Sequence, residues 1–320
     1  MKKLGIDIGG ANTKIASSDG AVCELHYVPL WKETKLPTVL KNISKKHNPS
    51  HVGVVMTGEL ADCYEDKTAG VVGIMDIVRD CFDCEIDFLD QEGNFIKHTQ
   101  NPASLAAANW MASASFIARK MKDCLFVDMG STTSDLIPVK NGKVIAHNTD
   151  TQRLANNELL YQGILRTNIA ALLDSVAIRP GNCQVASELF ATSADAYLLL
   201  SYIDEDAYTC ETADGHGKSE KEAARRLARV VCADLNEIDM ADVRKIAVAV
   251  KDRQKEKLSE AISELCHKHD INIVLAAGLG EFLIKTTCEE LGIECISLAE
   301  KWSLDVSKVF PAYAVANLLE

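Results

Sequence analysis

Apolar positions along the chain form two kinds of pattern, short strand-like runs and longer stretches with a helical period. Strand-like runs and helical stretches alternate through most of the sequence, which predicts an α/β fold. The predicted strands are residues 2–9, 12–18, 21–28, 51–56, 85–89, 143–146, 271–276 and 294–297. The predicted helices are residues 36–46, 70–82, 102–121, 185–200, 218–236, 240–250, 256–269, 281–291 and 310–319.

Residues 4–14 and 125–135 share one sequence plan. Each segment has an apolar strand run, an Asp, one apolar residue, then Gly and a cluster of small hydroxyl or amide residues, before a second strand. This plan predicts two β-hairpins with Gly-containing turns. A lone Asp-x-Gly is more often a simple turn, but two copies suggest a duplicated pair of domains that offer phosphate loops to one cleft.

The chemistry expected of these hairpins is phosphate and metal binding. Glycines let the turn backbone approach a ligand, and exposed N–H groups and hydroxyls hydrogen-bond phosphate oxygens. Asp7 and Asp128, at the strand ends, are placed to hold Mg²⁺ directly or through water. The phosphate- or nucleotide-binding candidates are Gly9, Gly10, Asn12, Thr13, Lys14, Gly130, Ser131, Thr132 and Thr133.

Two other strand ends carry candidate site residues. The predicted strand 51–56 leads into Thr57, Glu59, Asp62 and Lys67, and open α/β sheets place ligands at the carboxyl ends of parallel strands. A capped helix start with Thr57 as N-cap explains these residues equally well. After the strand 271–276, Gly278 and Gly280 permit a phosphate or a flat ligand to lie on the N-terminus of the next helix; tight packing is the alternative.

Two small-residue helices, 102–121 and 310–319, are expected to pack tightly and to cross between the domains. Asn101 is the expected N-cap of the first, with Pro102 at its first position. The polar segment 153–168 faces the cleft or is a surface loop, and the sequence leaves both open. Residues 204–217 are expected to form an exposed acidic loop or lid.

Composition limits the possible partners. The chain has 320 residues, a net charge of −12, 47% hydrophobic and 25% charged residues, as in soluble globular proteins. Such an acidic chain is a poor candidate for binding nucleic acid or an anionic membrane. The 11 cysteines are expected to be reduced thiols in a cytoplasmic protein, since no signal peptide or membrane-length apolar run is apparent. Structural thiols at Cys81 and Cys84 and an exposed helix end at residues 266–269 are favoured over metal sites.

The order hairpin, crossing helix, hairpin, Gly turn, crossing helix resembles the actin, sugar kinase and chaperone ATPase superfamily. The resemblance implies an α/β fold of two ribonuclease-H-like (actin-like ATPase) domains with an interdomain cleft. The implied domains are residues 1–122 with 305–320, and residues 123–304.

The sequence is also similar to the hydantoinase/oxoprolinase family, and within it to the condensing enzymes of methanofuran biosynthesis, a pathway linked to tetrahydromethanopterin one-carbon metabolism. The matching segments are 7–14, 57–62 with Lys67, 128–135, 161–167, 190–195 and 212–215. The resemblance implies an enzyme that joins the phenol of γ-glutamyltyramine to an aminomethylfuran-methyl diphosphate, giving an ether and diphosphate.

That reaction suits the candidate residues. Asp7 and Asp128 on Mg²⁺ would neutralise the departing diphosphate, and Glu59 or Asp62 would take the phenol proton. ATP is compatible with the Gly278–Gly280 turn but is not required by this reaction. The rival interpretations are an ATP-dependent kinase or ATP-driven hydrolase of a small metabolite, and a non-catalytic nucleotide sensor or filament protein.

Overall fold

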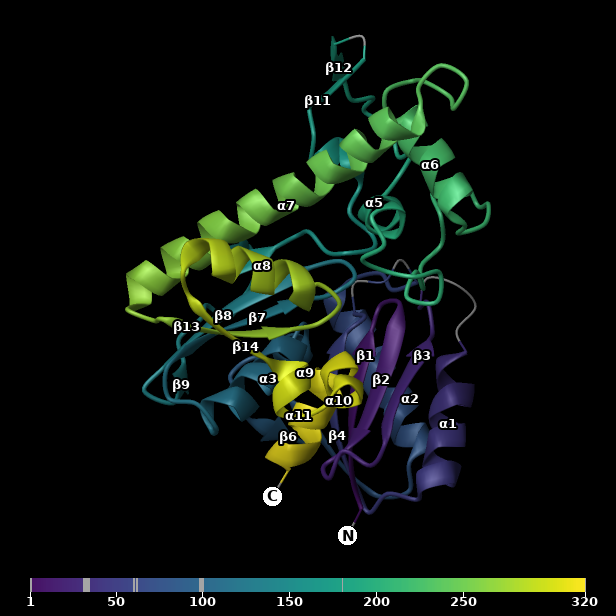
Figure 1. The fold of residues 1–320 in the computed structure, drawn as a ribbon. Helices are drawn as coiled ribbons and strands as arrows, with labels where there is room; N and C mark the ends of the chain where they lie inside the picture. The colour runs from purple at the N-terminus through teal and green to yellow at the C-terminus, as the bar shows by residue number, and fades with distance from the viewer. Residues whose placement is uncertain are drawn as a thin grey trace. The chain divides into compact units, whose positions relative to one another are not determined.

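The computed structural model describes residues 2–30, 35–59, 61, 63–97, 101–179 and 181–319. The chain divides into two compact units (Figure 1). The first unit comprises Met1–Phe126, Ile137–Asn156 and Ile296–Glu320, and the second comprises Val127–Leu136 and Asn157–Cys295.

The first unit is built on a six-stranded sheet in the order β3-β2-β1-β4-β5-β6. Strands β1, β2 and β3 are antiparallel neighbours, whereas β1, β4 and β5 run parallel, as the continuous apolar run of β4 predicts. The strand bounds are β1 Lys3–Gly9, β2 Asn12–Ser17, β3 Cys23–Tyr27, β4 His51–Thr57, β5 Glu85–Leu89 and β6 Phe95–Ile96.

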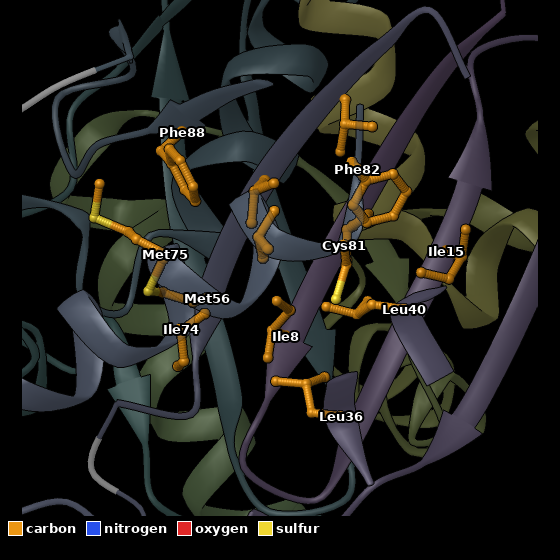
Figure 2. Packing of buried hydrophobic residues seen from close by; sticks show 14 of the residues in the cluster. Ile8, Ile15, Leu36, Leu40, Met56, Ile74, Met75, Cys81, Phe82 and Phe88 are labelled. Atoms are coloured by element: carbon orange, nitrogen blue, oxygen red, sulfur yellow. The ribbon is translucent and has the colours of Figure 1, made fainter. Parts of the chain in front are cut away.

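One face of this sheet packs against α1 (Leu36–His47) and α2 (Lys67–Cys81). Side chains alternate between the two faces of a strand, so Ile6 and Ile8 of β1 reach this core together. Figure 2 shows Ile8 and Ile15 from the sheet among Leu36 and Leu40 of α1 and residues of α2. The helix α1 ends at Asn48, which is left-handed with φ 42°, as the Asn-Pro sequence predicts.

The opposite face of the same sheet lies against α11 (Phe310–Leu318), which also packs on α3 (Asn109–Ala118). A Cβ atom at Gly5 would lie 1.8 Å from the carbonyl oxygen of Ala312, so only glycine allows the helix to sit this close to β1. The side chain of Asp7 projects from the same face as Gly5, two residues further along the strand.

Shorter elements complete the first unit. They are the 3₁₀ turn η1 (Pro102–Leu105), β9 (Lys143–Val144), α4 (Asp150–Ala155), α9 (Leu298–Lys301) and α10 (Leu304–Lys308).

A second sheet has the order β10-β8-β7-β13-β14, with β9 pairing on β8. Its strands are β7 Cys124–Met129, β8 Ser134–Lys140, β10 Leu159–Leu160, β13 Ile273–Ala277 and β14 Glu294–Ser297. The remaining elements all lie in the second unit and are η2 (Ile169–Ala171), β11 (Ser175–Ile178), β12 (Gly181–Gln184), α5 (Ser193–Leu199), α6 (Glu220–Arg229), α7 (Met240–His269) and α8 (Glu281–Leu291).

Several helix predictions are wrong in their limits, and the predicted helix 218–236 ends at Arg229. Residues 240–250 and 256–269 belong to one helix, α7, because no Gly or Pro interrupts the charged stretch between them. The predicted helix 102–121 is broken, since Ala106 is extended and Ala107 is left-handed with φ 50°. Helix α5 begins only after Thr192, which closes a capping box with Asp195, so residues 185–192 are not helical.

Arg226 of α6 contacts both the buried Asp195 and the acidic segment 204–217. Arg226 and Asp195 are both 0% exposed, and the Arg226 Nη2 atom lies 2.8 Å from Asp195 Oδ1. Arg226 also donates to Asp214 at 3.1 Å and to the Gly217 carbonyl at 3.0 Å. The acidic segment is therefore anchored to α6 at Asp214 and Gly217. Its composition alone had suggested an exposed loop without such anchors.

Candidate functional site

The first predicted hairpin is present, and it places a carboxylate and an ammonium side by side. Asp7 pairs across the strands with Lys14, and Lys14 Nζ lies 3.1 Å from Asp7 Oδ2. Asp7 is 1% exposed, and its second oxygen, Oδ1, is buried with no hydrogen-bond partner. Thr13 is also fully buried, with its hydroxyl unpartnered. Unsatisfied buried acceptors are rare and require a reason.

Two backbone hydrogen bonds from residues 28 and 30 fix the turn of this hairpin. Val28 N–H donates to the Ala11 carbonyl and Leu30 N–H to the Gly10 carbonyl, both at 2.9 Å. A Cβ atom at Gly9 would lie 2.9 Å from the Asn12 carbonyl oxygen, whereas one at Gly10 would meet nothing within 4 Å. Gly10 therefore borders open space, as a ligand-approaching glycine must.

The end of β4 lies beside this turn. Gly9 and Thr57 are register partners on parallel strands, and a Cβ atom at Gly58 would lie 3.3 Å from the Gly9 backbone. Thr57 does not cap a helix, because α2 begins at Lys67 with Asp66 as its N-cap; the capped-helix alternative is wrong. Residues 57–59 thus lie beside the first hairpin, within the first unit.

Glu59 is the buried carboxylate of this loop. It is 2% exposed, its Oε2 atom has no hydrogen-bond partner, and the N-terminal turn of α2 packs on its backbone at Gly70. Burial raises the pKa of Glu59, and this effect outweighs the lowering by the Lys67 charge and the Ala107 N–H. Ala107, which donates that N–H, is the residue with φ 50°. Asp62 lies outside the described residues.

The second hairpin brings together two segments that are far apart in sequence. Asp128 lies near the end of β7, and a Cβ atom at Gly278 would lie 2.3 Å from its Oδ1 atom. The Gly280 N–H donates to the Met129 carbonyl at 2.9 Å. Gly278 has φ 86°, a conformation that favours glycine. The predicted Gly turn before α8 therefore lies directly against the predicted Asp.

A segment that the sequence left undecided supports the second hairpin. Ile164 donates to the Gly130 carbonyl at 3.0 Å, and Leu165 and Arg166 donate to the Ser131 carbonyl at 3.0 and 2.9 Å. A Cβ atom at Gly163 would lie 2.5 Å from the Thr132 nitrogen. This segment holds the second hairpin as residues 28–30 hold the first.

Gly163 is itself fixed by side chains from three places. Its carbonyl oxygen accepts from Thr167 Oγ1 at 3.0 Å, Ser193 Oγ at 2.9 Å and Gln254 Nε2 at 3.0 Å. Gln254 is fully buried within the apolar stripe of α7. Residue 254 falls between the predicted helices 240–250 and 256–269, so this contact was not predicted; a Gln among the apolar positions of α7 is the signal that could have indicated it.

The structure therefore gathers the candidates into two groups. Asp7, Gly9, Gly10, Thr13, Lys14 and Glu59 lie together in the first unit, with Asn12 in the same hairpin. Asp128 lies with Gly278 and Gly280, and the turn residues Gly130, Ser131, Thr132 and Thr133 complete the second group. A site shared by Asp7 and Asp128 stays a prediction.

The residues of the first hairpin fit a divalent cation. Mg²⁺ prefers carboxylate oxygens, and Asp7 offers a buried oxygen that no donor satisfies. Lys14 contacts the other oxygen of the same carboxylate.

Among the helices in the described ranges, none has the length and apolar character needed to cross a membrane.

Two solved structures share this fold at low sequence identity. A ROK family glucokinase from Streptomyces griseus, in complex with glucose and AMPPNP, aligns with a TM-score of 0.52 and 12% identity over 99% of both chains. Acetone carboxylase in its nucleotide-free structure aligns with a TM-score of 0.57 and 10% identity over 98% of this chain and 70% of that one. The predicted α/β, actin-like two-domain fold is confirmed.

Curated relatives are much more similar. A (4-{4-[2-(gamma-L-glutamylamino)ethyl]phenoxymethyl}furan-2-yl)methanamine synthase from Methanocaldococcus jannaschii is 41% identical, covering 99% of this chain and 97% of its own length. A synthase of the same name from Methanococcus vannielii is 35% identical over 65% of this chain and 96% of its own length. The profile described as hydantoinase/oxoprolinase matches residues 51–320. The predicted resemblance is thus confirmed: the chain is an enzyme that belongs to the hydantoinase/oxoprolinase family.

Proposed function

We propose that this enzyme is a transferase that condenses γ-glutamyltyramine with an aminomethylfuran-methyl diphosphate, as a step of methanofuran biosynthesis. The observation that carries the proposal is the 41% identity, over nearly the full length of both chains, to a synthase named for a phenoxymethyl-furan product. That product is an aryl-alkyl ether, which a phenol and an activated furan-methyl group would form.

The proposed step makes one bond and breaks one. The phenol oxygen attacks the furan-methyl carbon, and the carbon–oxygen bond to diphosphate breaks, with its electron pair leaving on the diphosphate. The electron-rich furan stabilises positive charge on that carbon, so bond breaking can run ahead of attack. The phenol proton passes to a base, for which the buried Glu59 carboxylate is suited because burial raises its pKa.

The hairpins supply the groups that the leaving diphosphate needs. Gly10 borders open space, so the backbone of the first turn is accessible to a phosphate. Asp7, and by the shared sequence plan Asp128, would hold Mg²⁺, which when bound would neutralise charge on the diphosphate. Lys14 stands beside Asp7 and adds a positive charge. A protein of net charge −12 needs such local positive groups to bind a polyanion.

The test is a reaction of the purified enzyme with both substrates in the absence of nucleotide. The ether is detected by mass spectrometry, and diphosphate release by a coupled assay. We expect equal amounts of both products, loss of activity on chelation, and recovery with Mg²⁺. Ether formation that requires ATP hydrolysis, or phosphate transfer from ATP to either substrate, would replace this proposal with an ATP-dependent activity. No product under any of these conditions would favour a nucleotide sensor.

A further inference from the structure

Three side chains that commonly ligate metals meet at the start of two parallel strands in the first unit. His51 is the first residue of β4 and Glu85 the first of β5, and the two are register partners. Asp87 follows two residues after Glu85, so both carboxylates project from the same face of β5. The regular backbone of the sheet therefore sets this group, rather than a loop.

The atoms are close and partly shielded from solvent. His51 Nε2 lies 2.7 Å from Asp87 Oδ2, and His51 Nδ1 lies 4.0 Å from Glu85 Oε2. One ligand atom from each residue can be chosen so that all three lie within 4.8 Å of one another. Asp87 is buried, His51 nearly so, and Glu85 half-exposed. Within the described residues, only these three His, Cys, Asp or Glu side chains meet that criterion.

We propose that His51, Glu85 and Asp87 bind one divalent transition-metal ion of the zinc and cobalt class. One imidazole nitrogen and two carboxylate oxygens form a donor set typical of such ions, with water in the remaining position. Metal–ligand bonds of about 2.0–2.2 Å would require the two most distant ligand atoms of the group to move closer together. Glu85 is exposed enough to rotate inward, provided that it releases its contact with the exposed Lys97.

The proposed ion is distinct from any ion at the candidate active site. His51 opens β4 and Thr57 ends it, which places them about 20 Å apart at the usual rise of a strand. Bound metal would link β4 to β5 at the end of the sheet opposite to Asp7 and Glu59. Because it binds only the folded strands, it would raise the stability of the first unit.

The competing explanation needs no metal. His51 could bridge the two carboxylates through its two ring nitrogens, with Lys97 contacting Glu85. In that case metal ions would bind no more tightly to the intact group than to a variant without the imidazole. Binding measurements on matched variants therefore separate the two explanations.

The experiment titrates chelator-treated full-length protein with Co²⁺. The background carries Asp7→Asn and Asp128→Asn, so that the candidate active-site carboxylates do not contribute. We expect one equivalent of Co²⁺ to bind, with the visible absorption typical of nitrogen and oxygen ligands. His51→Gln or Asp87→Asn should weaken Co²⁺ binding by at least about 10-fold, since even changes outside the ligand set lower metal affinity about 10–100-fold. Zn²⁺ should raise the melting temperature of the background protein but not of either variant.

The control is His26→Gln. His26 also contacts a carboxylate of the first unit, Glu24, at 2.9 Å, but it does not belong to the three-residue group, so this variant should bind Co²⁺ normally. Three results would overturn the proposal: no saturable equivalent, equal binding after His51→Gln, or sulfur-to-cobalt charge-transfer absorption that assigns the ion to cysteines.

Discussion

Replacing Gly163 by Ala should damage the second hairpin while leaving its own sequence unchanged. The added Cβ would lie 2.5 Å from the Thr132 nitrogen and from the Ser131 carbonyl carbon, and 2.7 Å from the Gly130 oxygen. Carbon atoms in contact normally sit about 3.5–4.0 Å apart, so one side must retreat by roughly 1 Å. Gly163 cannot easily retreat, because four hydrogen bonds fix its N–H and carbonyl groups.

The displacement should therefore fall on the hairpin turn. Overpacking of this kind costs about 1–3 kcal/mol of stability, measurable as a lower denaturant midpoint. A shift of about 1 Å in a group that positions substrate can cost about 10²-fold in rate. Steady-state diphosphate release should report that loss, and faster hydrogen exchange at residues 130–133 should locate the disturbance.

The matched control is Gly181→Ala in the same unit. A Cβ atom at Gly181 would meet nothing within 4 Å, and its φ is not in the left-handed region, so stability and rate should stay close to wild type. If Gly163→Ala matches this control in denaturant midpoint, rate and hydrogen exchange, the segment does not position the hairpin and the reasoning fails.

Four further outcomes are expected. Gly10→Ala should keep the wild-type denaturant midpoint but raise KM for the furan-methyl diphosphate, because its Cβ enters open space; an unchanged KM would mean that no phosphate approaches this turn. Asp7→Asn and Asp128→Asn should each lower turnover about 10²-fold or more, and wild-type rates in both would remove them from the site. Because burial raises the pKa of Glu59, the acid limb of kcat/KM should lie above pH 4.5, the usual value, and Glu59→Gln should abolish that limb. Burial alone would raise the pKa of Glu24, but hydrogen bonds from three basic neighbours lower it to about 2, so this carboxylate stabilises the fold above its unfolded pKa of 4.5 and loses that effect as pH falls toward 2. Glu24→Gln should therefore lower the free energy of unfolding by about 1–2 kcal/mol at pH 6 and by little at pH 2. An equal decrease at both pH values would refute the ionic origin of this stabilisation.

Local patterns predicted most of the strands and both hairpins. The strands of the first unit carry their signal in adjacent residues, because alternation and turn glycines act over a few positions. The same holds for the end of α1 at Asn48 and for α8 after Gly280. The break at residues 106–107 depended on tertiary context, because Ala107 adopts a left-handed φ within an Ala-rich run that has high helix propensity. The errors at α5 and α7 had local causes, a capping box and the lack of a helix breaker.

The candidate site was predictable only in part for the same reason. Asp7 and Gly10 belong to a repeated motif, so sequence comparison within the chain reveals them. Gly163 has no such motif, and its role depends on Ser193 and Gln254, which reach it from distant parts of the chain. The three-residue group at His51 depends on strand register, which no single segment encodes.

The placement of α11 has a consequence for how the protein is made. This helix, near the carboxyl end, covers the side of the sheet on which Gly5 and Gly53 leave room for it, and Lys3 Nζ bonds the Leu319 carbonyl at 2.8 Å. The ribosome completes β1 to β5 long before it synthesises α11. The face of the sheet that carries Gly5, Asp7 and Gly53 therefore stays uncovered by this helix until translation is nearly complete, so the first unit can close its fold only late.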